Sequence, residues 1–432
     1  MSRRISQNKD LNLTEEVRDL QTGGKLVFTK YNGRDAAFWL SDNRLRAARF
    51  FPGENSRLGA VYIAKVKNVV KNLDACFVEI GNREEDVCFL SKKDSAYPFV
   101  LNRNSPDGRL REGDELPVQI IRGAQKNKQP SVTTLFSISN EYFALSVGSV
   151  HTGFSAKLSP EQKKSLRRIL KKNDLLTPTS PVESVPTGLV VRTRAAEFLT
   201  DEEHAEERVL TALNSLLSRW RELFETIPHR TCFSRVAKPP SPVEDVLEHL
   251  VSPREYEEII TDNADIYELL QNMECIPADK RIRFHDPGEA GFDPVRLYGL
   301  ESKMKTALER RVWLKSGAYL IIDVTEALTV IDVNSGKCEA KKDPEENYLR
   351  INREAAEEIA LQLRLRNLSG IIIADFINMK SPAAQTELLR YLTALTAADR
   401  QQTTVVDMTA LGLVEITRKK AHKSLREQME ER

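Results

Sequence analysis

Two apolar segments that each end in a carboxylate constrain the fold of this chain more than any other feature. The first is YLIIDVTEALTVIDVNSGK (319–337), in which a β-branched run ends at Asp332; the second is GIIIADFINMK (370–380), which ends at Asp375. Residues 344–366 between them have a helical pattern. Strand, helix and strand in this order predict a right-handed βαβ unit. Both carboxylates would then lie at the sheet edge where α/β folds bind ligands.

A divalent metal site is the chemistry that these carboxylates favour. Asp332 and Asp375 would hold Mg²⁺ or Mn²⁺, since hard cations prefer carboxylate oxygens, and such an ion activates water and offsets phosphodiester charge. Asn334 would share a strand face with Asp332 and orient it or donate to a phosphate. Asp323 is a candidate supporting residue and Asp407 a weaker one. The alternative is that these aspartates only cap the structure after each strand.

Composition narrows the class of protein. The 432 residues suggest about three domains, and the net charge of +1 means that any nucleic-acid surface must be local. No run of 18 apolar residues predicts a membrane span, and the N-terminus lacks the apolar segment of a secretory signal. The five cysteines, odd in number and without a CxxC pair, predict reduced thiols and a cytoplasmic location.

The N-terminal part is predicted to consist of short strands. Residues 25–51 alternate as two or three strands joined by Asn-Gly and Asp-Asn turns. The five strand-like runs that follow Gly59 predict a small closed β-barrel. Phe77 and Phe89 lie in two of these strands and Lys128 in a basic turn, and aromatics beside cations can bind single-stranded nucleic acid. The alternative is that both phenylalanines belong to the barrel core.

A strand that ends in Arg192 and Thr193 (GLVVRT, 188–193) is a candidate phosphate site. A guanidinium beside a hydroxyl can grip a terminal phosphate through bidentate hydrogen bonds; the alternative is an ordinary exposed strand end. A helix is predicted over 158–172, opened by Ser159-Pro160, and its basic face could follow RNA or simply be solvated. Further elements are predicted as helices over 201–226 and 383–397, a strand over 403–408, and a charged helix over 418–432 with nothing to bury.

Several of these segments together resemble the ribonuclease E/G family of bacterial endoribonucleases. The resemblance rests on the order of the barrel, the Arg-Thr strand and three blocks: EALTVIDVNSGK (326–337), LQLRLRNLSGIIIADFINM (361–379) and GLVEITRKK (412–420). It extends from about residue 25 to 425, nearly the whole chain.

The resemblance implies an α+β multidomain fold. An RNase H-like scaffold would be interrupted by an OB-type β-barrel and a 5′-sensor region, and followed by a DNase I-like α/β catalytic subdomain. The expected boundaries are 1–24 for a mobile leader, 25–58 and 231–300 for the RNase H-like part, 59–140 for the barrel, 141–230 for the 5′-sensor region, 301–417 for the catalytic subdomain and 418–432 for a charged C-terminal helix.

The same resemblance implies roles for individual residues. Asp332 and Asp375 match the family's magnesium-binding aspartates, Asn334 the residue that supports them, and Arg192 with Thr193 the pair that holds a 5′-monophosphate. The segments that carry Phe77, Phe89 and Lys128 fall where the family's barrel contacts RNA.

The implied function is metal-dependent cleavage of single-stranded RNA to 5′-phosphate and 3′-hydroxyl products, in mRNA decay and rRNA processing. A non-catalytic RNA-binding protein of the same fold is the alternative, and a DNA endonuclease is a weaker third.

Departures from the family pattern affect assembly. This sequence has no CxxC after the catalytic part, where family members place cysteines that share zinc between protomers. We therefore expect no structural zinc and no tetramer, while a homodimer stays open. Asn378 stands where an acidic residue often follows the second aspartate.

Overall fold

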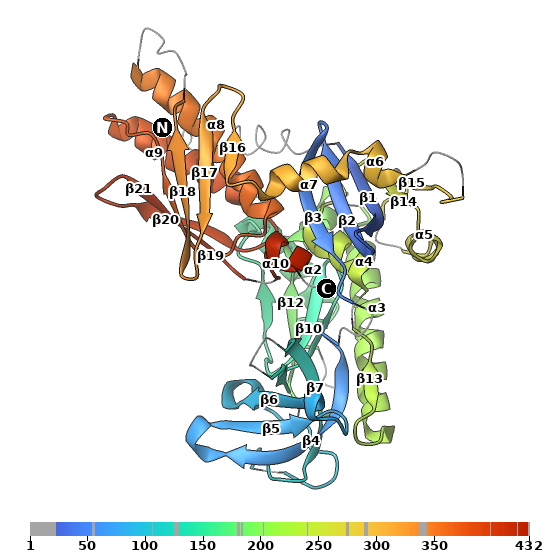
Figure 1. The fold of residues 1–432 in the computed structure, drawn as a ribbon. Coiled ribbons are helices and arrows are strands. Elements are labelled where there is room, and N and C mark those ends of the chain that lie inside the picture. Colours follow the sequence, from blue (N-terminus) through green and yellow to red (C-terminus); the bar gives the residue numbers. More distant parts are fainter. Residues whose placement is uncertain are drawn as a thin grey trace. The chain divides into compact units, whose positions relative to one another are not determined.

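The computed structural model divides the chain into two compact units (Figure 1). The first comprises Met1–Phe51 and Pro242–Arg432, and the second comprises Pro52–Ser241. The structure describes residues 23–53, 57–105, 107–124, 129–178, 182, 185–201, 203–239, 241–273, 276–288, 293–336, 344–397, 399–420 and 422–430. Nearly all of the predicted leader 1–24, and Lys128, lie outside these residues. No helix of the described part combines the length and the apolar composition needed to cross a bilayer.

A mixed sheet in the first unit begins at the N-terminal strands. Its order is β15-β14-β1-β2-β3, with β1 to β3 antiparallel and β1, β14 and β15 parallel. The strands are β1 Lys25–Tyr31, β2 Arg34–Ser41, β3 Arg44–Phe50, β14 Glu258–Thr261 and β15 Arg281–Phe284. Asn32, Gly33, Asp42 and Asn43 have the positive φ angles that tight hairpin turns require, which confirms both predicted turns.

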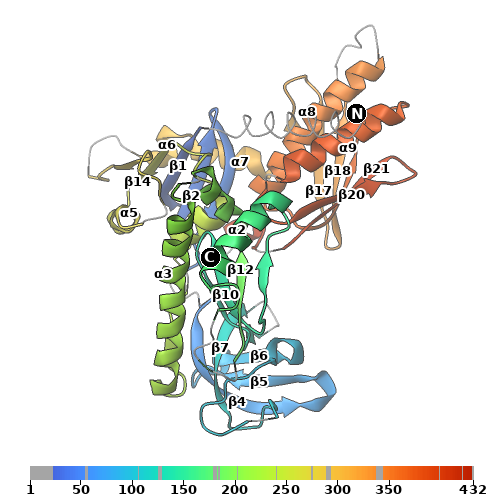
Figure 2. The same cartoon turned by 180° about the vertical axis from the view of Figure 1, so that it is seen from behind.

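A second sheet in the same unit contains the predicted βαβ unit. Its order is β16-β17-β18-β19-β21-β20, and β18 and β19 are parallel. The strands are β16 Arg311–Trp313, β17 Tyr319–Val324, β18 Leu328–Asn334, β19 Gly370–Asp375, β20 Thr403–Met408 and β21 Leu413–Arg418. Helix α8 (Pro344–Leu365) connects β18 to β19, and α8 and α9 (Pro382–Ala397) cover one face of the sheet (Figures 1 and 2).

Shorter helices complete the first unit. They are α4 Pro242–Asp245, a π-helical turn Val246–Leu250, α5 Ala264–Gln271, α6 Pro294–Leu297, α7 Leu300–Leu308 and α10 Leu425–Glu430. The prediction of a C-terminal helix over 418–432 with nothing to bury was wrong. Arg418 ends a strand, and the helix begins at Leu425, which is fully buried in the apolar cluster beside the N-terminal sheet. Gln428 is also buried and accepts a hydrogen bond from the Phe50 backbone N–H at 3.1 Å.

A closed β-barrel forms one part of the second unit. Its strands follow the order β4-β5-β6-β8-β7, and pairing of β4 with β7 closes it. They are β4 Val61–Val70, β5 Ala75–Glu79, β6 Val87–Ser91, β7 Glu115–Arg122 and β8 Ser131–Thr133. Strand β13 (Arg235–Ala237) pairs with β4 in the antiparallel direction. The closed barrel is as predicted. However, its last run is not one strand, because β9 (Ser137–Ser139) leaves the barrel and joins another sheet.

That other sheet has the order β11-β12-β10-β9 and carries the predicted Arg-Thr strand end. The remaining strands are β10 Phe143–Val147, β11 Thr152–Phe154 and β12 Thr187–Val191. Two predicted helices are confirmed with slightly shorter bounds, α2 Pro160–Lys172 and α3 Ala205–Thr226. Ser159 caps α2 as predicted, because its side chain accepts a hydrogen bond from the Gln162 N–H. Helix α3 buries Trp220 completely in the core of this sheet.

Candidate active site

Asp332 and Asp375 lie side by side on two neighbouring parallel strands. Pairing of β18 with β19 runs from Leu328 opposite Ile371 to Asp332 opposite Asp375. Neighbouring strands are about 4.8 Å apart, so the two carboxylates project from adjacent backbones. The predicted meeting of both carboxylates at one sheet edge is confirmed, while their catalytic role stays a prediction.

The alternation of side chains directs this pair away from the helices. Ile331, Val333 and Ala374 are buried in the core that α8 and α9 cover. Because successive strand residues point to opposite faces, Asp332 and Asp375 lie on the other face, where both are half-buried. The chain therefore presents the carboxylates on the face opposite the helical layer.

Electrostatics at this edge favour a cation. Burial, followed by the negative charge of Asp332, raises the pKa of Asp375 above its ordinary value. The Asn334 side-chain amide donates a hydrogen bond to Asp332 Oδ2 at 2.5 Å, which orients that carboxylate. Two adjacent carboxylates repel each other, and a hard divalent cation relieves that repulsion while it uses their oxygens as ligands.

Within the described part of the chain, no third acidic side chain joins this pair with metal-binding geometry. No group of three or more His, Cys, Asp or Glu side chains with metal-binding geometry occurs among the residues that the structure describes. Asp323 is paired with Arg310, whose Nε donates to its Oδ1 at 2.5 Å, and Asp407 is exposed on β20. Asn378 is exposed and lies near the turn at Gly412. The donor set is thus two carboxylates supported by Asn334.

Asn352 is a site residue that sequence analysis missed. It is completely buried on α8, and its side-chain amide forms two hydrogen bonds with the Ile377 backbone. Asn352 Nδ2 donates to the Ile377 carbonyl at 2.8 Å, and the Ile377 N–H donates to Asn352 Oδ1 at 3.0 Å. Because Ile377 follows Asp375 by two residues, this clamp fixes the chain just beyond the second carboxylate. The available signal was an amide side chain at a buried position of α8, although Asn347, Glu358 and Gln362 are buried on this helix too.

Phe77 and Phe89 form an aromatic pair on the outside of the barrel. They are directly opposite each other on β5 and β6, with ring centroids 5.8 Å apart in an edge-to-face arrangement. Both rings are half-buried, whereas the alternating residues, among them Val78 and Leu90, are buried in the barrel core. The alternative that both phenylalanines are core residues is therefore wrong. Their position leaves ring surface that a base can stack on.

Arg192 and Thr193 lie where β12 ends and a 3₁₀ helix begins. The Arg192 N–H donates to the Tyr142 carbonyl at 2.8 Å, and its Nη1 donates to the Asn140 carbonyl at 2.7 Å. The exposed Thr193 hydroxyl lies 2.7 Å from the Ser155 hydroxyl. The fold thus brings the Ser155 hydroxyl beside the Thr193 hydroxyl, next to Arg192 in the chain.

An ion pair that sequence analysis missed supports this strand end. Arg194 pairs with the buried Glu141 carboxylate, and its guanidinium lies 5.5 Å from the centre of the Tyr142 ring. Burial alone would lower the pKa of Arg194, but the negative charges of Glu141 and Glu197 raise it above its ordinary value. The ion pair and the ring contact therefore fix the position of the charged Arg194 guanidinium.

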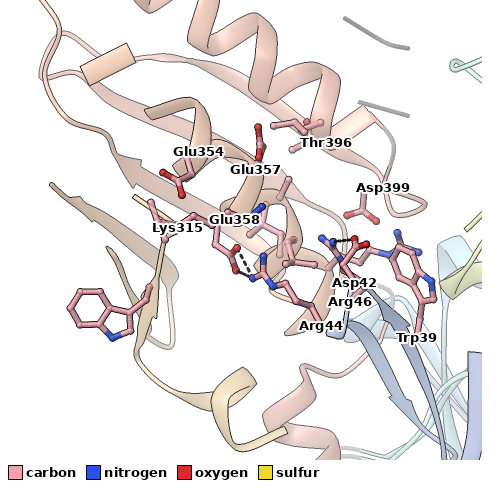
Figure 3. A pocket seen from close by; sticks show the side chains of 17 residues that line it. Trp39, Asp42, Arg44, Arg46, Lys315, Glu354, Glu357, Glu358, Thr396 and Asp399 are labelled. Carbon is pink, nitrogen blue, oxygen red and sulfur yellow. Dashed lines mark hydrogen bonds and ion pairs between the residues drawn. The ribbon is translucent and has the colours of Figure 1, made fainter. Parts of the chain in front are cut away.

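A cavity of about 740 Å³ elsewhere in the first unit contains none of the predicted site residues. It lies between the β2–β3 hairpin and helix α8 (Figure 3), and Trp313 to Lys315 at the end of β16 also line it. Four of its charged groups form two internal ion pairs: Arg44 with Glu358 at 2.7 Å, and Arg46 with Asp42 at 2.9 Å. The carboxylate edge, not this cavity, is the better candidate for chemistry.

Comparisons with known proteins find similarity to ribonucleases of one family. The pattern of the Ribonuclease E/G family matches residues 137–421. Ribonuclease G of Escherichia coli is 30% identical over 388 residues, covering 85% of this chain and 74% of that protein. Ribonuclease G of Haemophilus influenzae is 29% identical, over 85% of this chain and 73% of that protein. Ribonuclease E of Synechocystis sp. is 30% identical, over 86% of this chain and 54% of that protein.

Proposed function

This chain belongs to the ribonuclease E/G family of endoribonucleases, and we propose that it cuts single-stranded RNA by metal-dependent hydrolysis. The observation that carries the proposal is the placement of Asp332 opposite Asp375, with the Asn334 amide hydrogen-bonded to Asp332. We propose RNA processing and decay in the cytoplasm as its setting. The free thiols Cys76, Cys88 and Cys232 support a reducing compartment.

In the proposed mechanism, Asp332 and Asp375 would hold Mg²⁺, with Mn²⁺ as a substitute. When bound, the ion lowers the pKa of a water molecule and offsets charge on the phosphodiester. Asn334 keeps the Asp332 carboxylate oriented. Water adds to phosphorus as the bond to the 3′ oxygen breaks, and the proton passes to that oxygen. The products are a 5′-phosphate and a 3′-hydroxyl.

RNA binding is assigned to the second unit. Phe77 and Phe89 on the barrel, together with Lys128, contact the RNA strand, and Arg192 with Thr193 hold a 5′-monophosphate. Support comes from the half-buried ring pair and from the backbone hydrogen bonds that orient Arg192. A monophosphate carries up to two negative charges, which suits a guanidinium beside hydroxyl donors.

The finer fold assignment is part of the same proposal. The barrel is OB-type, the N-terminal sheet belongs to an RNase H-like scaffold and the sheet with the two aspartates to a DNase I-like subdomain. Three antiparallel strands followed by two parallel ones support the scaffold assignment. The segment boundaries given above remain our proposal, as do the absence of structural zinc and a homodimer in preference to a tetramer.

Loss of either aspartate tests the function. Asp332→Asn and Asp375→Asn should each reduce single-turnover cleavage of a labelled single-stranded RNA at least about a hundredfold, because a neutral amide binds a hard cation weakly. RNA binding, measured by fluorescence anisotropy, should change little. Asp407→Asn is the matched control, since Asp407 is an exposed carboxylate on the same sheet.

The same measurements distinguish an endoribonuclease from a non-catalytic RNA-binding protein of this fold. Cleavage at wild-type rates in either variant, over a range of Mg²⁺ concentrations, would end the assignment of these residues. A wild-type protein that binds RNA but does not cut it with Mg²⁺ or Mn²⁺ would instead favour the non-catalytic RNA-binding protein.

A further inference from the structure

An exposed aromatic and cationic stack lies on the two strands next to β18. The rings of Trp313 on β16 and Tyr319 on β17 have centroids 5.1 Å apart. The Arg311 guanidinium lies 5.5 Å from the centre of the Trp313 ring and 4.7 Å from that of Tyr319. Trp313 is 61% exposed, which is unusual for so large an apolar side chain. We call Arg311, Trp313 and Tyr319 the ring platform.

Strand register connects the ring platform to the candidate catalytic residues. Tyr319 pairs with Asn334 on one side and with Trp313 on the other, so these three form one row across the sheet. The next row contains Arg311, Ile321, Asp332 and Asp375. Directly opposite residues share a sheet face. Tyr319 therefore lies on the strand next to Asn334. Trp313 lies one strand further, about 10 Å from β18, which is twice the strand spacing.

This face of the sheet is the one that the helices leave open. Val312, Leu320 and Ile322 alternate with the platform residues and are buried in the core under α8 and α9. Figures 1 and 2 show both helices on a single side of the sheet. No carboxylate among the described residues forms an ion pair with Arg311, so its charge is available to a phosphate.

We propose that the ring platform stacks a nucleobase of the RNA substrate next to the phosphodiester that is cut. Aromatic rings bind bases of any sequence by stacking, and Arg311 supplies the charge that complements the strand's phosphates. The proposal rests on the proposed function, and it adds to the first unit a contact that is separate from the phenylalanine pair on the barrel. The base would fix the phosphodiester relative to Asp332 and Asp375.

The test combines a protein variant with a change in the RNA. Substrates are a 5′-phosphorylated single-stranded RNA with one cleavage site and a set in which a single abasic ribose replaces each nucleotide in turn. Proteins are the wild type, Trp313→Ala, Trp313→Phe and the control Leu297→Ala. Leu297 is also 61% exposed, on helix α6 of the same unit. Single-turnover cleavage rates and sedimentation masses are measured for each.

Trp313→Ala should slow cleavage of the intact RNA about fivefold or more, the scale of one lost stacking contact. In the wild type, an abasic ribose at one position beside the cut should have the same effect, and Trp313→Ala should be insensitive to it. Such non-additivity marks a direct contact. Trp313→Phe should retain most of the rate, and Leu297→Ala should match the wild type.

Other results would overturn the proposal that the ring platform stacks a nucleobase. Additive effects of Trp313→Ala and the abasic ribose at every position would exclude a stacked base there. Trp313→Ala could instead have a lower sedimentation mass than the wild type and respond to each abasic substrate as the wild type does. That result would make this face an interface between two copies of the chain. No cleavage by the wild type would remove the proposed function and the platform with it, whereas normal wild-type cleavage with no Trp313 effect would remove the platform alone.

Discussion

At the scale of single residues, the proposed roles of Asp332 and Arg192 depend on neighbouring groups that orient their charged side chains. Asn334 donates to Asp332, and the Asn140 carbonyl accepts from Arg192. A side chain already oriented within the protein loses less conformational entropy when it binds a ligand. Residues that touch no substrate can therefore contribute to binding through the residues they orient.

Arg192 gives the residue-scale prediction. RNA with a 5′-monophosphate should be cut faster than the same RNA with a 5′-hydroxyl, and Arg192→Ala should remove that preference. A hydrogen bond to a charged group contributes about 1.5–3 kcal/mol, which corresponds to roughly a tenfold or larger preference. Cleavage rates of both substrates are compared in the wild type, Arg192→Ala and the control Arg219→Ala, an exposed arginine on α3 of the same unit.

Two outcomes would count against this role. Equal wild-type rates on the two substrates would leave no 5′-end sensor to assign. Equal losses on both substrates in Arg192→Ala would mean that Arg192 serves folding or general RNA binding.

At the scale of elements, the position of the carboxylates depends on how α8 packs against β19. The helix contributes apolar side chains such as Ile351, Ala355 and Ile359 to the core, and one buried amide that binds the backbone beyond the strand. A buried amide in such a core is stable only when its donor and acceptor are both satisfied. The Ile377 backbone provides both, so packing and the placement of Asp375 are coupled.

Asn352→Leu tests that coupling. The variant leaves the half-buried Ile377 N–H and carbonyl without their Asn352 partners, which should lower the free energy of unfolding by about 1–3 kcal/mol. Cleavage should fall about tenfold, with half-saturation at higher Mg²⁺, because supporting contacts typically change metal affinity by 10–100-fold. Asn272→Leu is the control, since Asn272 is an exposed helix-end residue whose amide donates to the Glu268 carbonyl.

The Mg²⁺ dependence distinguishes positioning from simple destabilisation. If Asn352→Leu lowers only the unfolding free energy and leaves the Mg²⁺ dependence of cleavage unchanged in the folded protein, Asn352 has no part in positioning Asp375.

At the scale of the whole molecule, segments far apart in the sequence are joined by buried and half-buried charged groups. In the first unit, Arg49 pairs with Asp245 at 2.7 Å, and His422 lies 4.0 Å from the same carboxylate. Burial, followed by the positive charge of Arg49, lowers the pKa of His422 to about 4, although Asp245 partly offsets this. The folded protein therefore holds this imidazole in its neutral form.

Acid should destabilise the first unit through His422. An unfolded chain protonates histidine near pH 6.5, whereas the folded protein does so only near pH 4. The unfolded state thus binds more protons between these values, and stability should fall as the pH decreases from about 6.5 to 4, by at most about 3 kcal/mol. Urea midpoints between pH 4.5 and 7 should depend less on pH in His422→Gln.

The control is His151→Gln, since His151 is exposed. A pH dependence in His422→Gln as steep as that of the wild type would show that His422 does not cause the acid sensitivity.

The sequence by itself determined most elements of this protein and one part of its site. Strand alternation and the helical period predicted β18, α8 and β19, and Ser159 predicted the start of α2. Asp332 and Asp375 could be placed at one edge because the two strands of a βαβ unit are parallel, so their carboxyl ends lie at the same edge. Each of these elements is specified by residues that are close in sequence, because hydrophobic period, turn residues and capping residues act locally.

Tertiary structure alone decided which distant side chains meet. Asn352 binds the Ile377 backbone, Leu425 fills the cluster beside the N-terminal sheet, and Tyr319 shares a row with Trp313 and Asn334. Neither the helical period nor strand alternation specifies which partner a residue finds across an interface. Pairing register and core packing select those partners, so the clamp, the buried C-terminal helix and the ring platform became visible only in the folded chain.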